Sequence, residues 1–301
     1  MTNLKIYILP VEKKFMPEMS DNIYPFRNKT AYGVEQDFFI YLNNHPELCV
    51  YNPQEADWHY LPVFWFNFYR NYSDPLPAIP EVQSQVDKVI IDSKKTFTIC
   101  QYNPGILVDA GQTVLFLSSR KSDGGIDIPL LCDRHQVPIS CEKKFLASFV
   151  GLLWTHEIRA KLKNYFQKDE SIKIIGTKKN VQLFVQLFID AMIKSYIALC
   201  PRGTGGDSFR FYEAMDFSVV PFFIGDIDCR PFKKYIDWNS ISFFANTVEG
   251  VNEILDKYAN SLEELLEIGS KAKQVFENEI YYQKWCKYVL KELEDVSDII
   301  D

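Results

Sequence analysis

The chain has 301 residues, of which 47% are hydrophobic and 15% aromatic, and its formal net charge is −7. This length and composition are sufficient for two globular domains and exclude a disordered chain. A negative net charge without a block of like charges argues against nucleic acid, or another polyanion, as the main partner.

The cysteines, the histidines and the N-terminal sequence indicate the compartment of the protein and whether it binds a metal or spans a membrane. The seven cysteines are scattered and form no CxxC pair, which is typical of reduced thiols in a cytosolic protein. The four histidines show no HxxxH spacing, so we expect no bound metal. The N-terminus lacks a signal peptide's features, and no apolar run reaches about 18 residues, so we expect a soluble, cytoplasmic chain without a membrane span.

The first half of the chain contains four predicted strands and two predicted helices. Short apolar runs bounded by turn residues predict strands, and apolar residues at helical spacing predict helices. The predicted strands are Leu4–Leu9, Glu55–Phe64, Thr96–Gln101 and Val114–Ser118, and the predicted helices are Tyr32–Leu42 and Val82–Ser93. Glycines and prolines between residues 123 and 143 carry turn chemistry, so we place a domain linker there, with domains at 1–140 and 141–301.

The segment Trp65–Tyr72 is unusually aromatic and follows directly on a predicted strand. Its asparagines, its arginine and the Ser-Asp-Pro sequence after it favour a loop. In an open α/β sheet, ligands bind outside the carboxyl ends of the strands, and aromatic faces beside polar groups suit a sugar. We therefore interpret four residues as an acceptor-binding set: Trp65, Phe66, Tyr69 and Arg70. Packing of these rings in the core, or a lid, is the alternative.

The second half of the chain alternates between the two kinds of element. The predicted strands are Phe145–Gly151, Ile172–Ile175, Tyr196–Cys200, Val219–Ile224 and Ile241–Ala245. The predicted helices are Thr155–Phe166, Val181–Lys194, Ser208–Phe217, Val251–Tyr258, Ser261–Asn278 and Tyr281–Leu293. Thr155 is the expected cap of the first of these helices, and Asp207 or Ser208 of the third.

The stretch from Ser195 to Asp226 combines a strand, a glycine-rich turn and a helix start. Backbone N–H groups and the positive end of the helix dipole meet at such a turn and form an anion site. Arg202 and Arg210 flank it, and guanidinium groups suit phosphate oxygens. Glu213 could accept hydrogen bonds from ribose hydroxyls, as the acid of dinucleotide sites does. A tight turn with a surface pair between Arg210 and Glu213 is the alternative.

This stretch resembles the exostosin-like family of inverting glycosyltransferases. It reads CPRGTGGDSFRFYEAMDFSVVPFFIGD, and the family signature is roughly CPRG-x-x-x-x-SFR-x-x-EA-x-x-x-x-x-IP-x-x-x-x-D. Two shorter matches stand upstream, EAD-x-x-x-x-P from Glu55 and IR-x-x-L from Ile158. The chain departs from the family before Thr96, where it reads IDSKKTF instead of a GRDH-like motif with an Asp-His pair.

The resemblance implies an α/β protein of the GT-B fold. Such a protein has two Rossmann-like domains facing a cleft, and its C-terminal helix, here about residues 280–298, crosses back to the N-terminal domain. The N-terminal domain would bind the acceptor and the C-terminal domain the nucleotide-sugar donor. The implied reaction moves a hexose or pentose from a UDP-sugar to a hydroxyl of a glycan with inversion, without a cofactor or a metal.

The resemblance also implies roles for individual residues. The implied donor-binding residues are Arg159, Arg202, Gly203, Thr204, Gly205, Gly206, Asp207, Ser208, Arg210 and Glu213. The arginines and the backbone N–H groups would stabilise the leaving diphosphate, and Glu213 would hold the ribose. A general base is expected from the N-terminal domain, facing the cleft. Asp74 is our candidate for the base, and Glu35 and Asp57 are the alternates.

Three other interpretations remain open. Asp226-Ile227-Asp228 is a DxD sequence, which metal-dependent glycosyltransferases of the GT-A fold use to hold the diphosphate. Gly203, Gly205 and Ser208 after a strand imitate the dinucleotide-binding fingerprint of oxidoreductases, without its third glycine. The same fold could also act without catalysis, as a glycan-binding or partner module.

Overall fold

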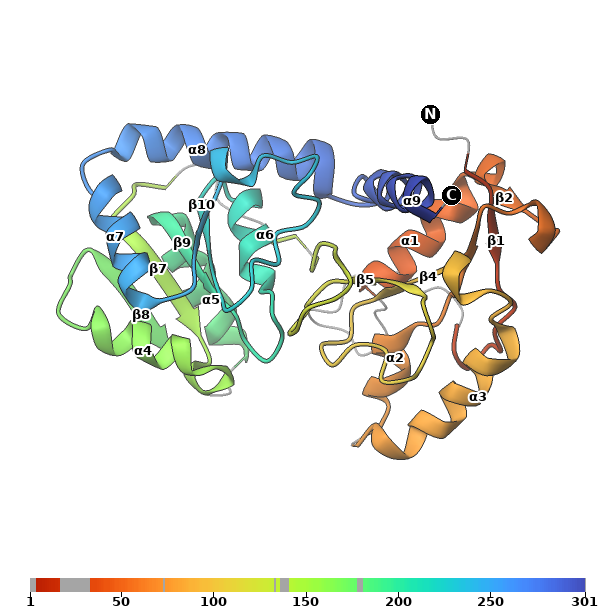
Figure 1. The fold of residues 1–301 in the computed structure, drawn as a ribbon. Coiled ribbons are helices and arrows are strands. Elements are labelled where there is room, and N and C mark those ends of the chain that lie inside the picture. Colours follow the sequence, from red (N-terminus) through yellow and green to blue (C-terminus); the bar gives the residue numbers. More distant parts are fainter. Residues whose placement is uncertain are drawn as a thin grey trace. The chain divides into compact units, whose positions relative to one another are not determined.

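The computed structural model describes residues 4–16, 33–72, 74–132, 134–135, 141–177 and 181–300. The chain forms two compact units, residues 1–133 with 281–301 and residues 134–280 (Figure 1). Each unit contains one sheet, and every pairing between its described strands is parallel. Residues 133 and 136–140 of the predicted linker lie outside the described residues.

The first unit is built on a sheet with the strand order β2-β1-β3-β4-β5-β6. Its strands are β1 Ile6–Ile8, β2 Cys49–Val50, β3 Trp58–Tyr60, β4 Thr96–Cys100, β5 Val114–Leu117 and β6 Ile126–Asp127. Its helices are α1 Gly33–Asn44, α2 Trp65–Arg70, α3 Ile79–Val89 and α9 Cys286–Ile300.

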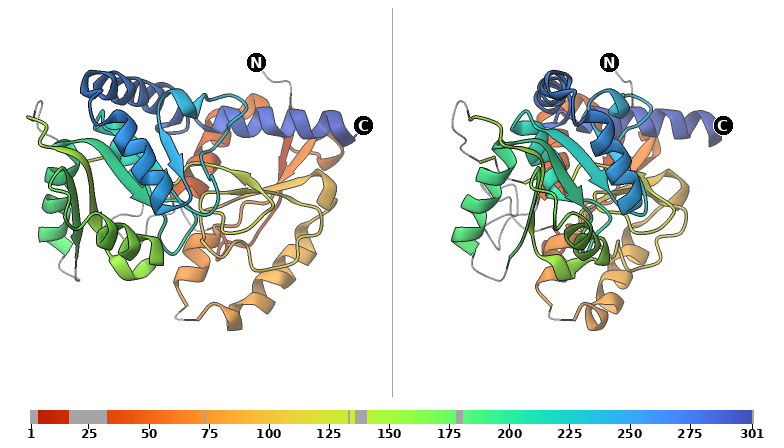
Figure 2. Two further views of the ribbon diagram at one scale, coloured as in Figure 1. Left: turned by 60° about the vertical axis from the view of Figure 1, so that its left-hand side comes forward. Right: turned by 90° about the vertical axis from the view of Figure 1, so that its left-hand side faces the viewer.

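The C-terminal helix α9 belongs to this first unit, as predicted. Trp285, just before α9, donates from Nε1 to Asp37 Oδ2 of α1 at 2.9 Å, and its ring lies 6.1 Å from that of Phe38. Further along, Ser297 accepts a hydrogen bond from Trp58 Nε1 of β3 at 3.0 Å. Both views in Figure 2 show α9 beside α1. The end of the chain therefore completes the core of the unit that its beginning forms.

The aromatic segment predicted as a loop is instead the short helix α2. Trp65, Phe68 and Tyr69 lie at helical spacing and are all buried. Both carboxylate oxygens of Glu35 accept from Phe66 N at 3.1 Å, which satisfies one N–H group at the helix start. The loop prediction was wrong because the burial of these rings and the hydrogen bonds to Glu35 depend on other segments of the chain. A short window of sequence does not show such contacts.

The second unit is built on a sheet with the strand order β11-β10-β9-β7-β8. Its strands are β7 Phe145–Gly151, β8 Ile172–Gly176, β9 Ser195–Pro201, β10 Val220–Ile224 and β11 Phe243–Ala245. Its helices are α4 Glu157–Tyr165, α5 Val181–Ile193, α6 Phe209–Asp216, α7 Val248–Tyr258 and α8 Leu262–Val275, and a π-helical turn at Phe276–Ile280 follows α8.

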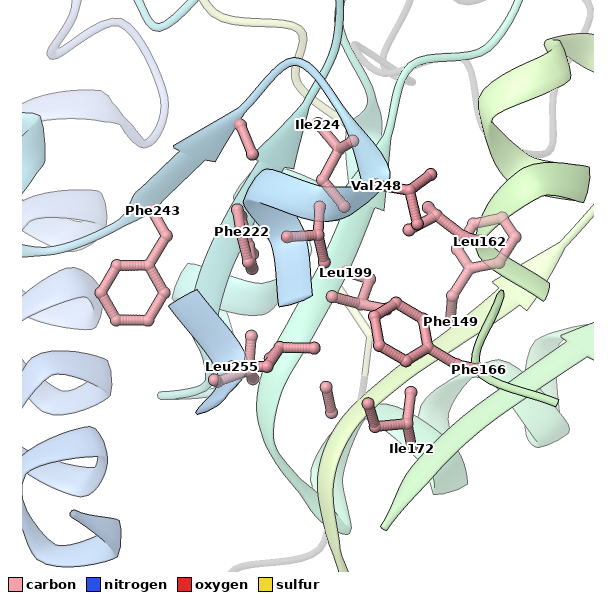
Figure 3. Close-up of a cluster of buried hydrophobic side chains, with 14 of the residues drawn as sticks. Phe149, Leu162, Phe166, Ile172, Leu199, Phe222, Ile224, Phe243, Val248 and Leu255 are labelled. Atoms are coloured by element: carbon pink, nitrogen blue, oxygen red, sulfur yellow. The ribbon is translucent and has the colours of Figure 1, made fainter. Parts of the chain in front are cut away.

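The main core of the second unit lies between its sheet and the helices α4 and α7 (Figure 3). Phe149 and Phe222 of the strands pack there with Leu162 of α4 and Val248 of α7. The predicted cap of α4 was wrong. His156, not Thr155, caps this helix, because its Nδ1 accepts from Ile158 N at 3.4 Å.

The helices that follow the neighbouring strands β7 and β9 lie on opposite faces of the second sheet. The chain leaves β7 through α4 on the face that carries Phe222. It leaves β9 through α6, whose Phe211 contacts Phe223 on the opposite face at 5.7 Å between ring centroids. Ligands of open α/β sheets bind outside the carboxyl ends of the strands at such a switch point. The glycine-rich loop follows β9 at this position.

Candidate functional site

The loop 202–208 joins the carboxyl end of β9 to the start of α6, and Asp207 holds it from inside. This carboxylate is buried, and it accepts from Ser208 N at 2.6 Å and from the Tyr212 hydroxyl at 3.1 Å. Ser208 stands at the N-cap position of α6, but its side chain makes no capping hydrogen bond. Of the two residues predicted to cap this helix, Asp207 is therefore the one whose side chain fixes the turn.

Arg159 on α4 links the carboxyl ends of β7 and β9 by hydrogen bonds. Its guanidinium group donates to three backbone carbonyls, of Leu152 at 3.1 Å, Pro201 at 2.9 Å and Arg202 at 2.8 Å. Burial, together with the charge of Arg210, lowers the pKa of Arg159 to about 9. A Cβ atom at Gly203 would lie 2.9 Å from the guanidinium, which explains a glycine there. Arg159 therefore holds the backbone at the start of the loop in place.

Arg210 on α6 is held among aromatic rings. Its Nε and Nη2 both donate to Val150 O, at 3.0 and 2.7 Å. The guanidinium carbon lies 5.1 Å from the ring of Phe149 and 5.3 Å from that of Phe188. The guanidinium of Arg159 also lies over Phe149, at 5.3 Å, so two arginines share this ring at the switch point.

Arg202 is the third arginine of the site and the first residue of the loop. Its Nη1 forms an ion pair with Asp226 at the end of β10. Its Nε is buried and has no hydrogen-bond partner. A buried donor without a partner costs roughly 1–3 kcal/mol, so a ligand oxygen or a water beside Nε would stabilise the site.

Glu213, the predicted ribose-binding acid, lies one helical turn from Arg210. Its Oε1 is 2.6 Å from His135 Nε2, and both side chains are about one-twentieth exposed. Arg134, the residue before His135, forms an ion pair with Asp216, which lies on α6 as Glu213 does. The alternative surface pair between Arg210 and Glu213 does not form, since Arg210 donates to Val150 O and Glu213 contacts His135.

A cavity of about 620 Å³ lies beside this arginine cluster, between helix α4 and the start of α7. His156, Asp226 and Asn246 line it, and so does Tyr165, which is half exposed. Burial, then the charge of Arg202, lowers the pKa of His156 below its usual 6.5, so the ring is neutral at pH 7. The lining combines carboxylate, amide and aromatic groups, which suits a ligand rich in hydroxyls.

The two acids of the DxD sequence have different arginine partners. Asp226 pairs with Arg202, and Asp228 pairs with Arg230 at 2.8 Å. Within the described ranges, no group of three or more His, Cys, Asp and Glu side chains is placed to hold a metal ion.

The three candidate bases of the first unit lie in different environments. Asp74 is exposed, and its Oδ1 accepts from Leu76 N at 3.1 Å in a turn after α2. Asp57 precedes β3, so it lies at the amino edge of the sheet, where it accepts from Lys5 N at 2.7 Å. Glu35 is fully buried. Asp57 and Asp74 are both exposed, but Asp57 precedes β3 whereas Asp74 lies after β3, beyond α2.

The predicted acceptor-binding set divides into two pairs. Trp65 and Tyr69 are buried in the core, where Trp65 Nε1 donates to Thr98 Oγ1 at 2.9 Å and the Tyr69 hydroxyl to Ile106 O at 2.5 Å. Phe66 is half buried, and the guanidinium of the exposed Arg70 lies 5.5 Å from its ring. A ligand can reach Phe66 and Arg70 in this structure but not the other two.

Sequence reasoning missed two histidines of the site. His135 lies in the stretch assigned to the linker, and His156 stands directly beside the predicted cap Thr155. A lone histidine carries no spacing signal. Only the fold brings His135 to Glu213 and His156 to within 3.9 Å of Asp226.

Comparison with known proteins identifies similar sequences. The family model described as RXYLT1 C-terminal domain matches residues 129–231, which include β7, α4 and the arginine loop. The chain is 24% identical over 281 residues to Exostosin-1 homolog of Caenorhabditis elegans, covering 79% of this chain and 71% of the relative. It is 26% identical over 87 residues to ribitol-5-phosphate xylosyltransferase 1 of Homo sapiens, covering 27% of this chain and 20% of that protein.

Among solved structures, the crystal structure of TarM is similar with a TM-score of 0.39 at 11% identity, covering 69% of this chain and 56% of that chain. In the part of the chain that the structure describes, no helix has both the length and the apolar character that crossing a membrane requires.

Proposed function

Because this chain is a relative of the exostosin-like glycosyltransferases, we propose that it transfers a sugar from a UDP-sugar to a hydroxyl group of a glycan, with inversion at the anomeric carbon. The observation that carries the proposal is the buried, unpartnered Nε–H of Arg202 at the start of the loop between β9 and α6. Arginine and a helix start together suit a diphosphate, and both lie at the switch point of the sheet.

The three arginines have different tasks in this proposal. Arg202 donates to the diphosphate of the donor and stabilises the charge that develops when the bond to the sugar breaks. Arg159 and Arg210 donate to backbone carbonyls, so they hold the loop and the end of β7 in place and add positive potential. Preorganised charge of this kind needs no rearrangement during the reaction.

The remaining groups bind the donor's other parts and activate the acceptor. Glu213 accepts hydrogen bonds from the ribose hydroxyls. The sugar enters the cavity beside Asp226, where Asn246 and Tyr165 offer a hydrogen-bonding group and an aromatic face. Asp74 takes the proton of the attacking hydroxyl. An Asp74→Asn variant is then expected to lose about 100-fold or more in kcat while its affinity for UDP is unchanged.

Nucleotide binding tests this function directly. UDP, GDP and NAD are titrated calorimetrically into the wild type, Arg202→Gln and Arg230→Gln, with and without Mn²⁺. Arg230→Gln is the matched control, because Arg230 is also a buried arginine paired with an aspartate at the end of β10. We expect UDP to bind without metal, and Arg202→Gln to weaken it about tenfold or more, or about 1.4 kcal/mol.

Each other result points elsewhere. A requirement for Mn²⁺ would favour the metal-dependent alternative, and preferential binding of NAD would favour an oxidoreductase. Absence of nucleotide binding by the folded wild type would refute the enzyme proposal. Binding of UDP without hydrolysis or transfer of any UDP-sugar, across a panel of glycan acceptors, would indicate a non-catalytic module.

A further inference from the structure

The hydrogen bond between His135 and Glu213 is unusually enclosed. The distance from Nε2 to Oε1 is 2.6 Å, and the two side chains are 5% and 4% exposed. The rings of Phe188 and Phe217 lie 5.9 and 6.0 Å from the imidazole. A carboxylate in such apolar surroundings requires a hydrogen-bond donor, and the imidazole N–H supplies one.

His135 reaches Glu213 from a segment outside the loop and helix that form the donor site. Its neighbour Arg134 attaches the same segment to α6 by its ion pair with Asp216, and to the π-helical turn after α8 by its ion pair with Glu277. Two consecutive residues therefore contact two acids that lie three positions apart on α6. Arg134 supplies a contact to α6 of its own, so attachment of the segment does not depend on His135 alone.

We propose that His135 is a positioning residue for the donor's ribose. This inference rests on the proposed function, in which Glu213 binds the ribose hydroxyls. A carboxylate has two oxygens and about four acceptor positions. His135 occupies Oε1 and fixes the rotation of the carboxylate, which directs Oε2 toward the hydroxyl groups. The ribose hydroxyls then meet a carboxylate that is already oriented. Loss of this orientation is expected to weaken the binding of ligands that carry those hydroxyls.

The experiment compares UDP with 2′,3′-dideoxyuridine diphosphate, which has the same base and diphosphate but no ribose hydroxyls. Calorimetric affinities are measured for the wild type, His135→Ala, His135→Gln and Arg134→Ala. We expect the wild type to prefer UDP by about 100-fold, since buried acceptors reject an analogue that leaves them unpaired. His135→Ala is expected to reduce the affinity for UDP about tenfold and to leave that for the dideoxy analogue unchanged.

Two variants separate positioning from mere structural support. The amide of His135→Gln still offers an N–H donor, so we expect it to recover part of the preference for UDP. Arg134→Ala removes the other attachment of the same segment without touching Glu213, so we expect it to keep the full preference. Equal losses for both ligands in His135→Ala, or a lost preference in Arg134→Ala, would overturn the inference.

A double-mutant cycle with Glu213→Gln completes the test. If His135 acts through Glu213, His135→Ala should have no further effect on the ribose preference in that background. A wild type that binds neither nucleotide would refute the proposed function itself. A wild type that prefers UDP, with a preference unchanged in a folded His135→Ala variant, would refute only the role of His135.

Discussion

At the scale of single residues, backbone groups near strand ends hold three charged side chains, Arg159, Arg210 and Glu35. Arg159 and Arg210 donate to carbonyls that follow or end β7 and β9, and Glu35 accepts from backbone N–H groups after β3 and β4. Residue type alone indicated charge at these positions. It could not indicate that Arg159 would be only 6% exposed.

Glu35 gives the molecule a pH dependence of stability. Burial raises the pKa of this carboxyl well above its usual 4.5, although hydrogen bonds from Gln101 N and Phe66 N oppose the shift. The folded state therefore binds the proton more tightly than the unfolded state. The stabilisation from this group is complete below pH 4.5 and is lost as the pH rises through the folded value.

The variant Glu35→Gln should remove that dependence. Urea unfolding of the wild type and the variant at several pH values is expected to show a free-energy difference that shifts in favour of the variant as the pH rises above 4.5. Glu55→Gln, at an exposed glutamate, is the control and should give a constant difference. A constant difference for Glu35→Gln would contradict the assignment.

At the scale of elements, helix α8 crosses the turn between α6 and β10 at Gly269. A Cβ atom at this glycine would lie 2.4 Å from the backbone oxygen of Ser218. Replacing glycine by alanine inside a helix normally stabilises it by about 1 kcal/mol. Here we expect Gly269→Ala to destabilise the protein by roughly 1–3 kcal/mol, because the helix would have to move away from the turn.

Thermal and urea unfolding would measure this effect. Ser270→Ala, at the exposed neighbouring position of the same helix, reports the helix propensity alone and should be neutral or slightly stabilising. If Gly269→Ala were as stable as Ser270→Ala, the close approach of α8 to Ser218 would not constrain the fold.

The elements that could be predicted are those whose own residues determine them. The bounds of β7 are as predicted, because the strand is an apolar run, interrupted by Ser148, that ends in glycine. The strands β2 and β6 have two residues each and form only by pairing with β1 and β5, so a local pattern does not reveal them. Helix α2 was missed for the related reason that Glu35 fixes its start.

At the scale of the whole molecule, the prediction of two α/β units is confirmed by the two parallel sheets, and the predicted return of the C-terminal helix by the place of α9 in the first unit. The family signature placed the loop, Arg202, Arg210 and Glu213 in one unit, because these residues are close in sequence. It did not identify His135 or the Asp226 cavity, because those depend on contacts between distant segments.

The two units should differ when they are expressed as fragments. Residues 134–280 form one unit from a continuous segment, so we expect this fragment to unfold cooperatively on its own. Residues 1–133 lack Trp285, which is fully buried against Asp37 and Phe38, so this fragment should fold only when residues 281–301 are supplied. Circular dichroism melting of both fragments, with and without that peptide, checks the expectation. Cooperative melting of 1–133 alone would contradict it.

The return of α9 to the first unit also sets an order for folding during synthesis. The ribosome makes residues 134–280 between the two parts of the first unit. At 5–20 residues per second, the N-terminal part waits roughly 7 to 30 s for the helix that covers it. During that time the apolar face around Phe38 is exposed to chaperones or to aggregation, and the unit that is synthesised first becomes complete last.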